Sequence, residues 1–182
     1  ATDRTSEAIQ IIENQYNINC EIVIMIQGDE PLVSPSSLSL IIDEFKDIEI
    51  NVVNLISPFK SIKSFRDYNN VKVVFDNNCN ALYFSREPIP SNWKNDRELP
   101  IYNQVGVIGF RKNTLKKFLK LNESTLEKIE SVDMNRFLEN KKTIKLIKNS
   151  LPTLGVDNKL ELKKAEKMLQ KDFFTSRYLN LT

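Results

Sequence analysis

The chain has 182 residues, 41% of them hydrophobic and 27% charged, which is typical of one globular domain spanning residues 1–182. Its 26 basic and 24 acidic residues are interspersed and leave a net charge of +2, so the charge pattern indicates no nucleic-acid partner. No apolar run approaches the ~18 residues of a membrane-spanning helix and no signal-peptide pattern opens the chain, so we expect a cytoplasmic protein without membrane insertion.

Residue types that are missing or rare limit the chemistry. The sequence has no histidine, which excludes an imidazole base, a Ser/His/Asp triad and a histidine-ligated zinc within this chain. Its two cysteines, Cys20 and Cys79, are not spaced as metal ligands and are too few for a disulfide framework. Any metal must therefore bind to carboxylates, which favours a hard cation such as Mg²⁺ or Mn²⁺.

The first part of the chain alternates helix and strand. Residues 2–16 have helical spacing, and residues 21–27 are a continuous apolar run typical of a central parallel strand buried on both faces. Ser34 and Pro35 are the cap and first residue of a second helix, and residues 51–57 are a second strand. This order predicts an α/β fold with a doubly wound sheet.

The middle of the chain has a different pattern. Apolar residues 71–75 and 81–85 flank a turn-rich segment, which predicts a hairpin. Residues 102–110 resume as a strand that contains two glycines. We therefore expect an antiparallel insertion on the sheet at 71–111.

The last part returns to helices and one strand. Ser124 and Glu127 have the spacing of a capping box at the start of a helix. Residues 142–147 alternate as a strand does, and residues 158–170 carry the apolar stripe of a helix.

Two carboxylates, Asp29 and Glu30, follow the apolar strand at 21–27. Ligands of α/β proteins bind beyond the carboxyl ends of parallel strands. Carboxylates there are costly to desolvate unless a cation or a donor meets them. Asp29 is therefore a candidate ligand, with a cap of the turn after Gly28 as the alternative interpretation, and Glu30 has no assigned role.

Asp157 is a second candidate, just before the last predicted helix. In one interpretation Asp157 caps that helix. In the other, Asn158 is the cap and Glu161 completes a capping-box-like pair, which leaves Asp157 free to point elsewhere. Gly155 suggests a tight backbone approach at this loop.

Other polar residues also have two interpretations. Arg86, at a strand end, is either a surface charge or a guanidinium that grips a carboxylate or phosphate. Tyr83 is either a core residue or a ligand contact. Glu127 and Glu130, three apart on one helix, are typical of a solvated helix face.

Several segments together resemble the cytidylyltransferases that activate eight- and nine-carbon acidic sugars, above all the family of CMP-Kdo synthetases (3-deoxy-manno-octulosonate cytidylyltransferases). The segments cover nearly the whole chain in order: TDRTSEA, QGDEPL, VKVV, ALYFSREPIP, VGVIGFRKNTL, LEKIESVDMNRFLEN and GVD. QGDEP and ALYFSREPIP are specific, whereas TDR and LEKIE alone are weak. All four glycines of the chain lie in these segments.

The resemblance implies a Rossmann-like nucleotide-diphospho-sugar transferase fold with a mostly parallel, three-layer sheet. It also implies that the anomeric hydroxyl of a sugar acid such as Kdo attacks the α-phosphorus of CTP, giving CMP-sugar and pyrophosphate. The catalytic residues would be Asp29 and Asp157, which would hold Mg²⁺. The implied nucleotide contacts are Arg4, Gly28 and Asp29, and the implied sugar contacts are Gln27, Tyr83, Arg86, Gln104 and Glu130.

Departures from the family leave alternatives open. The family usually has histidine at the position of Gln104 and tyrosine at that of Ile108, so a related nucleotidyltransferase with another sugar or base is one alternative. No segment resembles the family's basic loop that holds the triphosphate. We therefore expect an N-terminally truncated domain that is inactive alone, and a non-catalytic sugar-binding or dimerisation module is the other alternative.

The resemblance also bears on assembly. The insertion at 71–111 resembles the region through which the family dimerises, so we expect a homodimer. A role in lipopolysaccharide or capsule precursor synthesis follows by family analogy alone.

Overall fold

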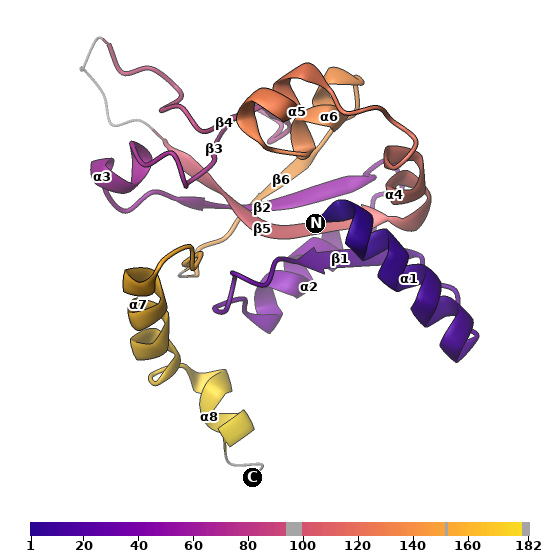
Figure 1. Cartoon of the computed structure of the whole chain (residues 1–182), viewed down its shortest axis with the longest axis horizontal. Helices are drawn as coiled ribbons and strands as arrows, with labels where there is room; N and C mark the ends of the chain where they lie inside the picture. Colours follow the sequence, from indigo (N-terminus) through magenta and orange to yellow (C-terminus); the bar gives the residue numbers. More distant parts are fainter. Residues whose placement is uncertain (94–99, 152, 180–182) are drawn as a thin grey trace.

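The computed structural model describes residues 1–93, 100–151 and 153–179, which form a sheet with helices packed on both faces (Figure 1). The strands are β1 (Ile22–Ile26), β2 (Val52–Pro58), β3 (Lys72–Phe75), β4 (Ala81–Ser85), β5 (Tyr102–Arg111) and β6 (Lys145–Lys148). The helices are α1 (Thr2–Tyr16), α2 (Pro35–Glu44), α3 (Ile62–Phe65), α4 (Lys112–Phe118), α5 (Thr125–Glu130), α6 (Met134–Glu139), α7 (Lys159–Leu169) and α8 (Phe173–Leu179). Among the described residues, no helix is both long and apolar enough to cross a membrane.

The sheet is built on β5. The strands β1, β2 and β3 all pair antiparallel with β5, β4 pairs with β3, and β6 pairs parallel with β2. The order along the sheet is β4-β3-β5-β2-β6, with β1 on β5. The mixed α/β fold is as predicted, but parallel pairing is confirmed only for β2 and β6, because β5 runs opposite to the strands that pair with it.

The prediction for β1, a central parallel strand buried on both faces, is wrong. This strand lies antiparallel to β5, with Ile26 opposite Val107, and β5 is its one strand partner in the described part of the chain. Val23 and Met25 are buried, whereas 46% of Ile26 is exposed. A continuous apolar run does not specify strand direction or the number of neighbouring strands, since both depend on distant segments.

The predicted hairpin is confirmed at β3 and β4. These strands pair antiparallel, with Lys72 opposite Ser85. In the turn between them, the Asp76 carboxylate accepts hydrogen bonds from the backbone N–H groups of Asn78 at 2.9 Å and Asn80 at 2.8 Å. Residues 94–99 of the predicted insertion lie outside the described residues.

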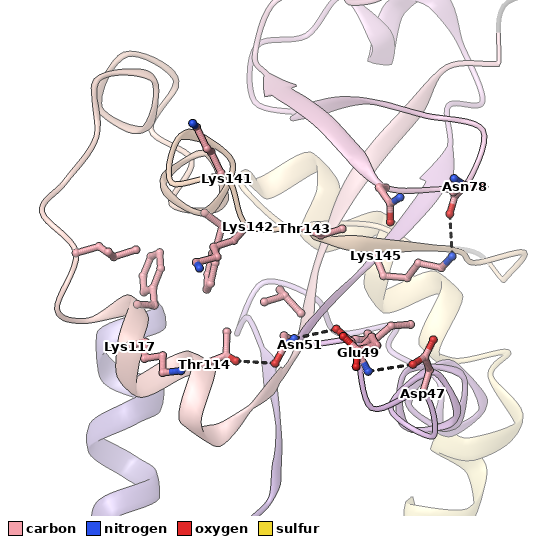
Figure 2. Close-up of a pocket in the computed structure, with 16 residues that line it drawn as sticks. Asp47, Glu49, Asn51, Asn78, Thr114, Lys117, Lys141, Lys142, Thr143 and Lys145 are labelled. Atoms are coloured by element: carbon pink, nitrogen blue, oxygen red, sulfur yellow. Dashed lines mark hydrogen bonds between the residues drawn. The ribbon is translucent and has the colours of Figure 1, made fainter.

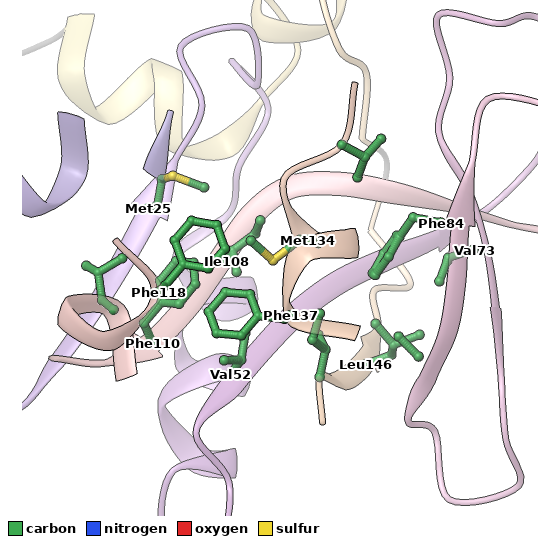
Figure 3. Packing of buried hydrophobic residues seen from close by; sticks show 14 of the residues in the cluster. Met25, Val52, Val73, Phe84, Ile108, Phe110, Phe118, Met134, Phe137 and Leu146 are labelled. Carbon is green, nitrogen blue, oxygen red and sulfur yellow. The ribbon is translucent and has the colours of Figure 1, made fainter. Parts of the chain in front are cut away.

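One hydrophobic cluster packs α4 and α6 against a face of the sheet (Figure 3). It includes Val52 and Phe110 from the strands and Phe118 and Phe137 from the helices. The rings of Phe118 and Phe137 stack with their centroids 4.5 Å apart. Such packing of large apolar side chains supplies most of the stability of a core.

The opposite face of the sheet is covered by α2, through Ile41 and Phe45. The helix comes close to β5 at Gly109. A Cβ atom at Gly109 would lie 2.5 Å from Ile41 Cγ2 and 2.8 Å from Phe45 Cε2, so only glycine fits there without movement of α2. Helices on both faces confirm the three-layer arrangement.

The helix starts predicted from local sequence signals are confirmed. Ser34 caps α2, its Oγ accepting a hydrogen bond from Ser36 N at 3.3 Å, and Pro35 is the first helical residue. At α5 the Glu127 carboxylate accepts a hydrogen bond from Ser124 N at 3.0 Å. Each helix therefore begins within one residue of the predicted position.

Candidate active site

The loop before α7 presents Asp157 without using it as a helix cap. Asn158 is the cap, its Oδ1 accepting hydrogen bonds from Leu160 N at 3.0 Å and Glu161 N at 3.1 Å. The Glu161 carboxylate accepts a hydrogen bond from Asp157 N at 2.9 Å. The second of the two interpretations is thus confirmed, and the Asp157 carboxylate is available to a ligand.

This loop meets the loop after β1. Val156 N donates a hydrogen bond to Asp29 O at 2.9 Å, which places Asp29 and Asp157 beside each other. Burial, and then the charges of Glu161 and Asp29, raise the pKa of Asp157. The charged form of Asp157 is therefore disfavoured by its surroundings, and a bound cation would relieve that.

A cavity of about 290 Å³ opens beside these two loops. Among the residues that line it are Gln27, Asp29, Glu30, Arg86, Gln104 and Asp157. The structure thus brings both predicted metal ligands together with several of the predicted sugar contacts. They come from the end of β1, the end of β4, the middle of β5 and the loop before α7.

Glu30 also lines this cavity, although the sequence alone assigned it no role. Its Oε1 accepts a hydrogen bond from Gly106 N at 2.7 Å, which ties the loop after β1 to β5. Burial chiefly raises the pKa of Glu30 to about 7, the charges of Asp29 and Asp157 add to this, and the Gly106 N–H opposes it. The available signal was the pair of carboxylates directly after an apolar strand.

Gly106 makes room for the side chain of Gln27. A Cβ atom at Gly106 would lie 2.8 Å from Gln27 Oε1 and 2.9 Å from its Cδ. The backbones of the two residues are also joined, since Gln27 N donates to Gly106 O at 2.8 Å. The glycine therefore determines where the predicted sugar contact Gln27 lies.

Gly155 differs from the prediction of a tight backbone approach. A Cβ atom there would meet nothing within 4 Å, and the same holds for Gly28. The approach of the two loops is made by the Val156–Asp29 backbone bond instead. A glycine in a loop does not by itself identify a close contact.

Arg86 is held by backbone carbonyl groups at the edge of the cavity. Its Nε donates to Glu130 O at 2.8 Å and its Nη1 donates to Tyr68 O at 2.9 Å. No described residue accepts a hydrogen bond from its Nη2. The guanidinium is thus fixed in place with donor capacity left for an anionic group of a ligand.

Tyr83 and Glu130 lie behind this wall of the cavity and do not line it. The Glu130 carboxylate is buried and accepts hydrogen bonds from Tyr83 Oη at 2.6 Å, Ser85 Oγ at 2.9 Å and Arg86 N at 2.7 Å. Burial and the bond to Glu130 raise the pKa of Tyr83 to about 12. The expectation of a solvated helix face is therefore wrong for both glutamates, because the end of β4 covers Glu130 and Glu127 is buried in an ion pair with Arg136.

The two remaining predicted nucleotide contacts are not at this cavity. Arg4 is exposed on α1 and does not line it, and Gly28 lies between two lining residues without lining it itself. The role of Arg4 in nucleotide binding thus stays a prediction from the resemblance.

The carboxylates present fit Mg²⁺. No cluster of three or more Asp, Glu, Cys or His side chains with the geometry of a metal site occurs in the described ranges. Mg²⁺ in nucleotide-dependent enzymes is usually held by one or two carboxylates, with waters and substrate phosphates as its other ligands. Asp29 and Asp157 supply such a pair.

A larger cavity, of about 630 Å³, lies elsewhere in the molecule (Figure 2). It is lined by Lys117, Lys141, Lys142 and Lys145 among others, and by none of the predicted site residues. This cavity is beside the first residues of β2 and β6. Because ligands of α/β sheets bind beyond the carboxyl ends of strands, the carboxylate-lined cavity is the better candidate for an active site.

Comparison with known proteins shows which family the chain belongs to. Residues 1–144 match the cytidylyltransferase family. A 3-deoxy-manno-octulosonate cytidylyltransferase of Bacteroides thetaiotaomicron is 36% identical over 177 residues, which are 93% of this chain and 69% of the relative. The chain belongs to the 3-deoxy-manno-octulosonate cytidylyltransferase family. The resemblance inferred from sequence motifs is thereby confirmed.

Other members of the family give the same result. The enzyme of Rickettsia rickettsii is 40% identical over 169 residues, with 93% of this chain and 67% of the relative covered. That of Christiangramia forsetii is 34% identical over 171 residues, with 92% of this chain and 66% of the relative covered. The chain thus spans about two thirds of the length of these relatives.

Solved structures share the fold. A CMP:2-keto-3-deoxy-manno-octonic acid synthetase in complex with CTP superposes with a TM-score of 0.79 at 28% identity, covering 94% of this chain and 68% of that one. A 4-diphosphocytidyl-2C-methyl-D-erythritol synthase of Anaerococcus prevotii has a TM-score of 0.51 at 14% identity, covering 88% and 64%, and supports the fold alone.

Proposed function

We propose that the protein transfers CMP from CTP to the anomeric hydroxyl of a 3-deoxy sugar acid, namely Kdo, and releases pyrophosphate. The observation that carries this proposal is the meeting of Asp29 and Asp157 at one cavity with Arg86 and Gln104. The names of the curated relatives support the sugar, and the solved relative with CTP supports the nucleotide.

The proposed reaction exchanges one bond at phosphorus for another. The anomeric oxygen forms a bond to the α-phosphorus, the bond from the α-phosphorus to the oxygen that bridges to the β-phosphate breaks, and the hydroxyl proton passes to solvent. Asp29 and Asp157 would hold Mg²⁺, which neutralises phosphate charge and lowers the pKa of the attacking hydroxyl. The backbone hydrogen bond from Val156 N to Asp29 O holds the loops that carry these two carboxylates next to each other.

The remaining residues of the cavity bind and orient the sugar acid in this proposal. The Arg86 guanidinium pairs with the sugar carboxylate, because it is held by backbone carbonyls and keeps donors free. Gln27 and Gln104 supply neutral hydrogen-bonding groups. Tyr83 and Glu130 act as positioning residues that fix the start of the loop carrying Arg86.

A panel of substrates tests the proposal with the complete gene product. We expect pyrophosphate release and a CMP-sugar of the correct mass from CTP with Kdo in the presence of Mg²⁺. ATP, GTP and UTP should react at least about a hundredfold more slowly, since buried polar groups reject a base that leaves them unpaired. Preference for another nucleotide, or no product with Kdo, would contradict the assignment.

A related transferase with a different sugar is a second candidate, favoured by one observation. Gln104 lines the cavity and cannot carry the charge of an imidazole. Including N-acetylneuraminate and other sugar acids in the panel separates the two candidates. A higher kcat/KM with one of these than with Kdo would identify the second.

A further inference from the structure

Asn54 is a buried amide in the middle of β2 whose orientation is set by its neighbours. Its side chain is inaccessible to solvent. Its Nδ2 donates hydrogen bonds to Leu55 O at 3.0 Å, Val105 O at 2.9 Å and Val107 O at 3.2 Å. The pairing of β2 with β5 shifts its register next to Asn54, which is where these carbonyl groups become available.

The chemistry of these partners allows one orientation of the Asn54 amide. Carbonyl oxygens accept hydrogen bonds and have no hydrogen to give, so only the amide nitrogen can face them. The opposite orientation would place an oxygen against three oxygens in a buried site, which is strongly unfavourable. Asn54 Oδ1 must therefore point the other way, and it accepts a hydrogen bond from Gln104 Nε2 at 2.7 Å.

The orientation of Gln104 follows from that of Asn54. Its amide nitrogen is directed to Asn54, so its Oε1 is at the other side of the planar amide group. Gln104 lines the carboxylate cavity, and no described residue donates a hydrogen bond to its Oε1. The amide thus offers the cavity a neutral acceptor that requires a donor from the ligand.

A second acceptor at the cavity also lacks a hydrogen-bond donor in the described part of the chain. Asn103 also lines the cavity, and its Oδ1 is buried without a hydrogen-bond partner among the residues described. Buried acceptors that lack a partner are rare, because their lost hydrogen bonds to water are not replaced. A ligand that carries hydroxyl groups would satisfy acceptors of this kind, whereas a ligand with acceptors alone would not.

We propose that Gln104 recognises one hydroxyl group of the sugar acid by accepting its hydrogen at Oε1, and that Asn54 is the positioning residue that holds Gln104 in this orientation. The inference rests on the proposed function for the identity of the ligand. It makes the Asn54–Gln104 pair a determinant of sugar specificity.

The test uses the complete gene product, CTP, Kdo and a set of Kdo analogues that each lack one hydroxyl other than the anomeric one. Gln104→Met keeps the length of the side chain and removes its acceptor. We expect the KM for Kdo to rise about fivefold to tenfold, the loss of one hydrogen bond, with kcat and the KM for CTP within about twofold of wild type. Gln10→Met, at an exposed position on α1, is the matched control.

The analogues distinguish recognition from a purely structural bridge between β2 and β5. With the wild type, the KM for one analogue should be about fivefold to tenfold higher than the KM for Kdo. With Gln104→Met, the KM for that analogue should differ little from the KM for Kdo, because both changes remove the same hydrogen bond. Asn54→Ala should raise the KM for Kdo by the same factor as Gln104→Met, and the double variant should have no higher KM than either single variant. If Asn54→Ala does not fold, the coupling between Gln104 and the analogue decides alone.

The results that overturn the inference differ from those that overturn the proposed function. An unchanged KM for Kdo in Gln104→Met, or losses that add for every analogue, would contradict the role of Gln104 while leaving the reaction intact. Absence of pyrophosphate release by the wild type would instead contradict the proposed function. In that case calorimetric titration of Kdo into the wild type and Gln104→Met decides the inference, and equal affinity or no binding overturns it.

Discussion

Glu130 joins the end of α5 to the end of β4 through one carboxylate. Burial alone would raise its pKa, but the hydrogen bonds from Tyr83, Arg86 N and Ser85 outweigh burial, and the pKa of Glu130 lies below its usual value. A folded-state pKa below the unfolded one stabilises the fold at every pH above the unfolded value. This stabilisation is lost as the pH falls through the folded-state pKa.

The first prediction concerns Glu130→Gln. At pH 7 we expect this change to lower the free energy of unfolding by about 1–3 kcal/mol, since the amide presents a donor where three donors already point. As the pH falls below about 4.5, the wild type should lose stability more steeply than the variant. Urea unfolding across this range measures both effects, with the exposed Glu49→Gln as control. Parallel pH profiles of the wild type and Glu130→Gln would refute the prediction.

A second residue-scale prediction concerns the contact of α2 with β5. Gly109→Ala should lower the free energy of unfolding by about 1–3 kcal/mol, because the added methyl group overlaps Ile41 and Phe45. Gly28→Ala is the matched control, since its Cβ would meet nothing within 4 Å. Denaturant melts measure the difference. Equal stability of the two variants would show that α2 does not pack on β5 as described.

Some of these residue-scale features could be predicted and others could not. The Asn158 cap and its bond to Glu161 follow from local sequence, so the availability of Asp157 was one of the predicted alternatives. The burial of Glu130 could not be predicted, because the residues that cover it come from β4, far away in the sequence. Local chemistry specifies caps, and tertiary packing decides which charges are buried.

At the scale of elements, Lys72 of β3 connects two segments at the cavity. Its side chain is fully buried, and its ammonium donates to the carbonyl oxygens of Asp67 at 2.7 Å, Asn70 at 2.9 Å and Arg86 at 2.5 Å. Burial lowers the pKa of Lys72. The bonds tie the loop before β3, which contributes Asn70 to the cavity, to the end of β4 that carries Arg86.

The third prediction is that Lys72→Met costs about 2–4 kcal/mol of unfolding free energy, because three carbonyl groups lose the ammonium that donates to them. The KM for the sugar acid should also rise, since Arg86 is no longer held from both sides. Thermal melts and kinetics on the same samples measure these two changes. Lys63→Met, at an exposed position on α3, should match the wild type in both. A stable Lys72→Met with normal KM would exclude the connecting role.

Elements were predicted better than their arrangement. Ser34 and Pro35 identify the start of α2, and the alternating pattern identifies the β3–β4 hairpin. The residues of β1 were predicted correctly, but its parallel direction was wrong, since Ile26 and its neighbours pair antiparallel with residues near Val107, far along the chain. The direction of a strand is defined relative to the strand beside it, and the local sequence does not show which distant segment that will be.

For the whole molecule, the sequence predicted some of the residues that line the candidate cavity, and the structure supplied their connection. Asp29 and Asp157 were candidates because each follows a strand or precedes a helix. The Val156–Asp29 backbone bond that unites them has no sequence signal. Glu30 stood out as a carboxylate after an apolar strand, but its role depends on Gly106 of β5, which is distant in the sequence.

Assembly gives the fourth prediction. Leu82 on β4 of the predicted insertion is 61% exposed, which suits an apolar contact with a second copy of the chain. We expect a homodimer by light scattering, and a shift toward monomer in Leu82→Arg. Leu160→Arg, at a residue 72% exposed on α7, should not change the mass. A monomeric wild type at high concentration would contradict the expected dimer.

The central claim is that Asp29 and Asp157 hold Mg²⁺ for CMP transfer, and pyrophosphate release from CTP and Kdo by the complete gene product tests it most directly. We expect activity that chelation by EDTA abolishes and Mg²⁺ restores. Asp29→Asn and Asp157→Asn should each lower kcat by roughly 10²–10³-fold with unchanged melting behaviour, whereas the exposed Asp43→Asn should not. Full activity in EDTA, or in both Asp29→Asn and Asp157→Asn, would contradict the account.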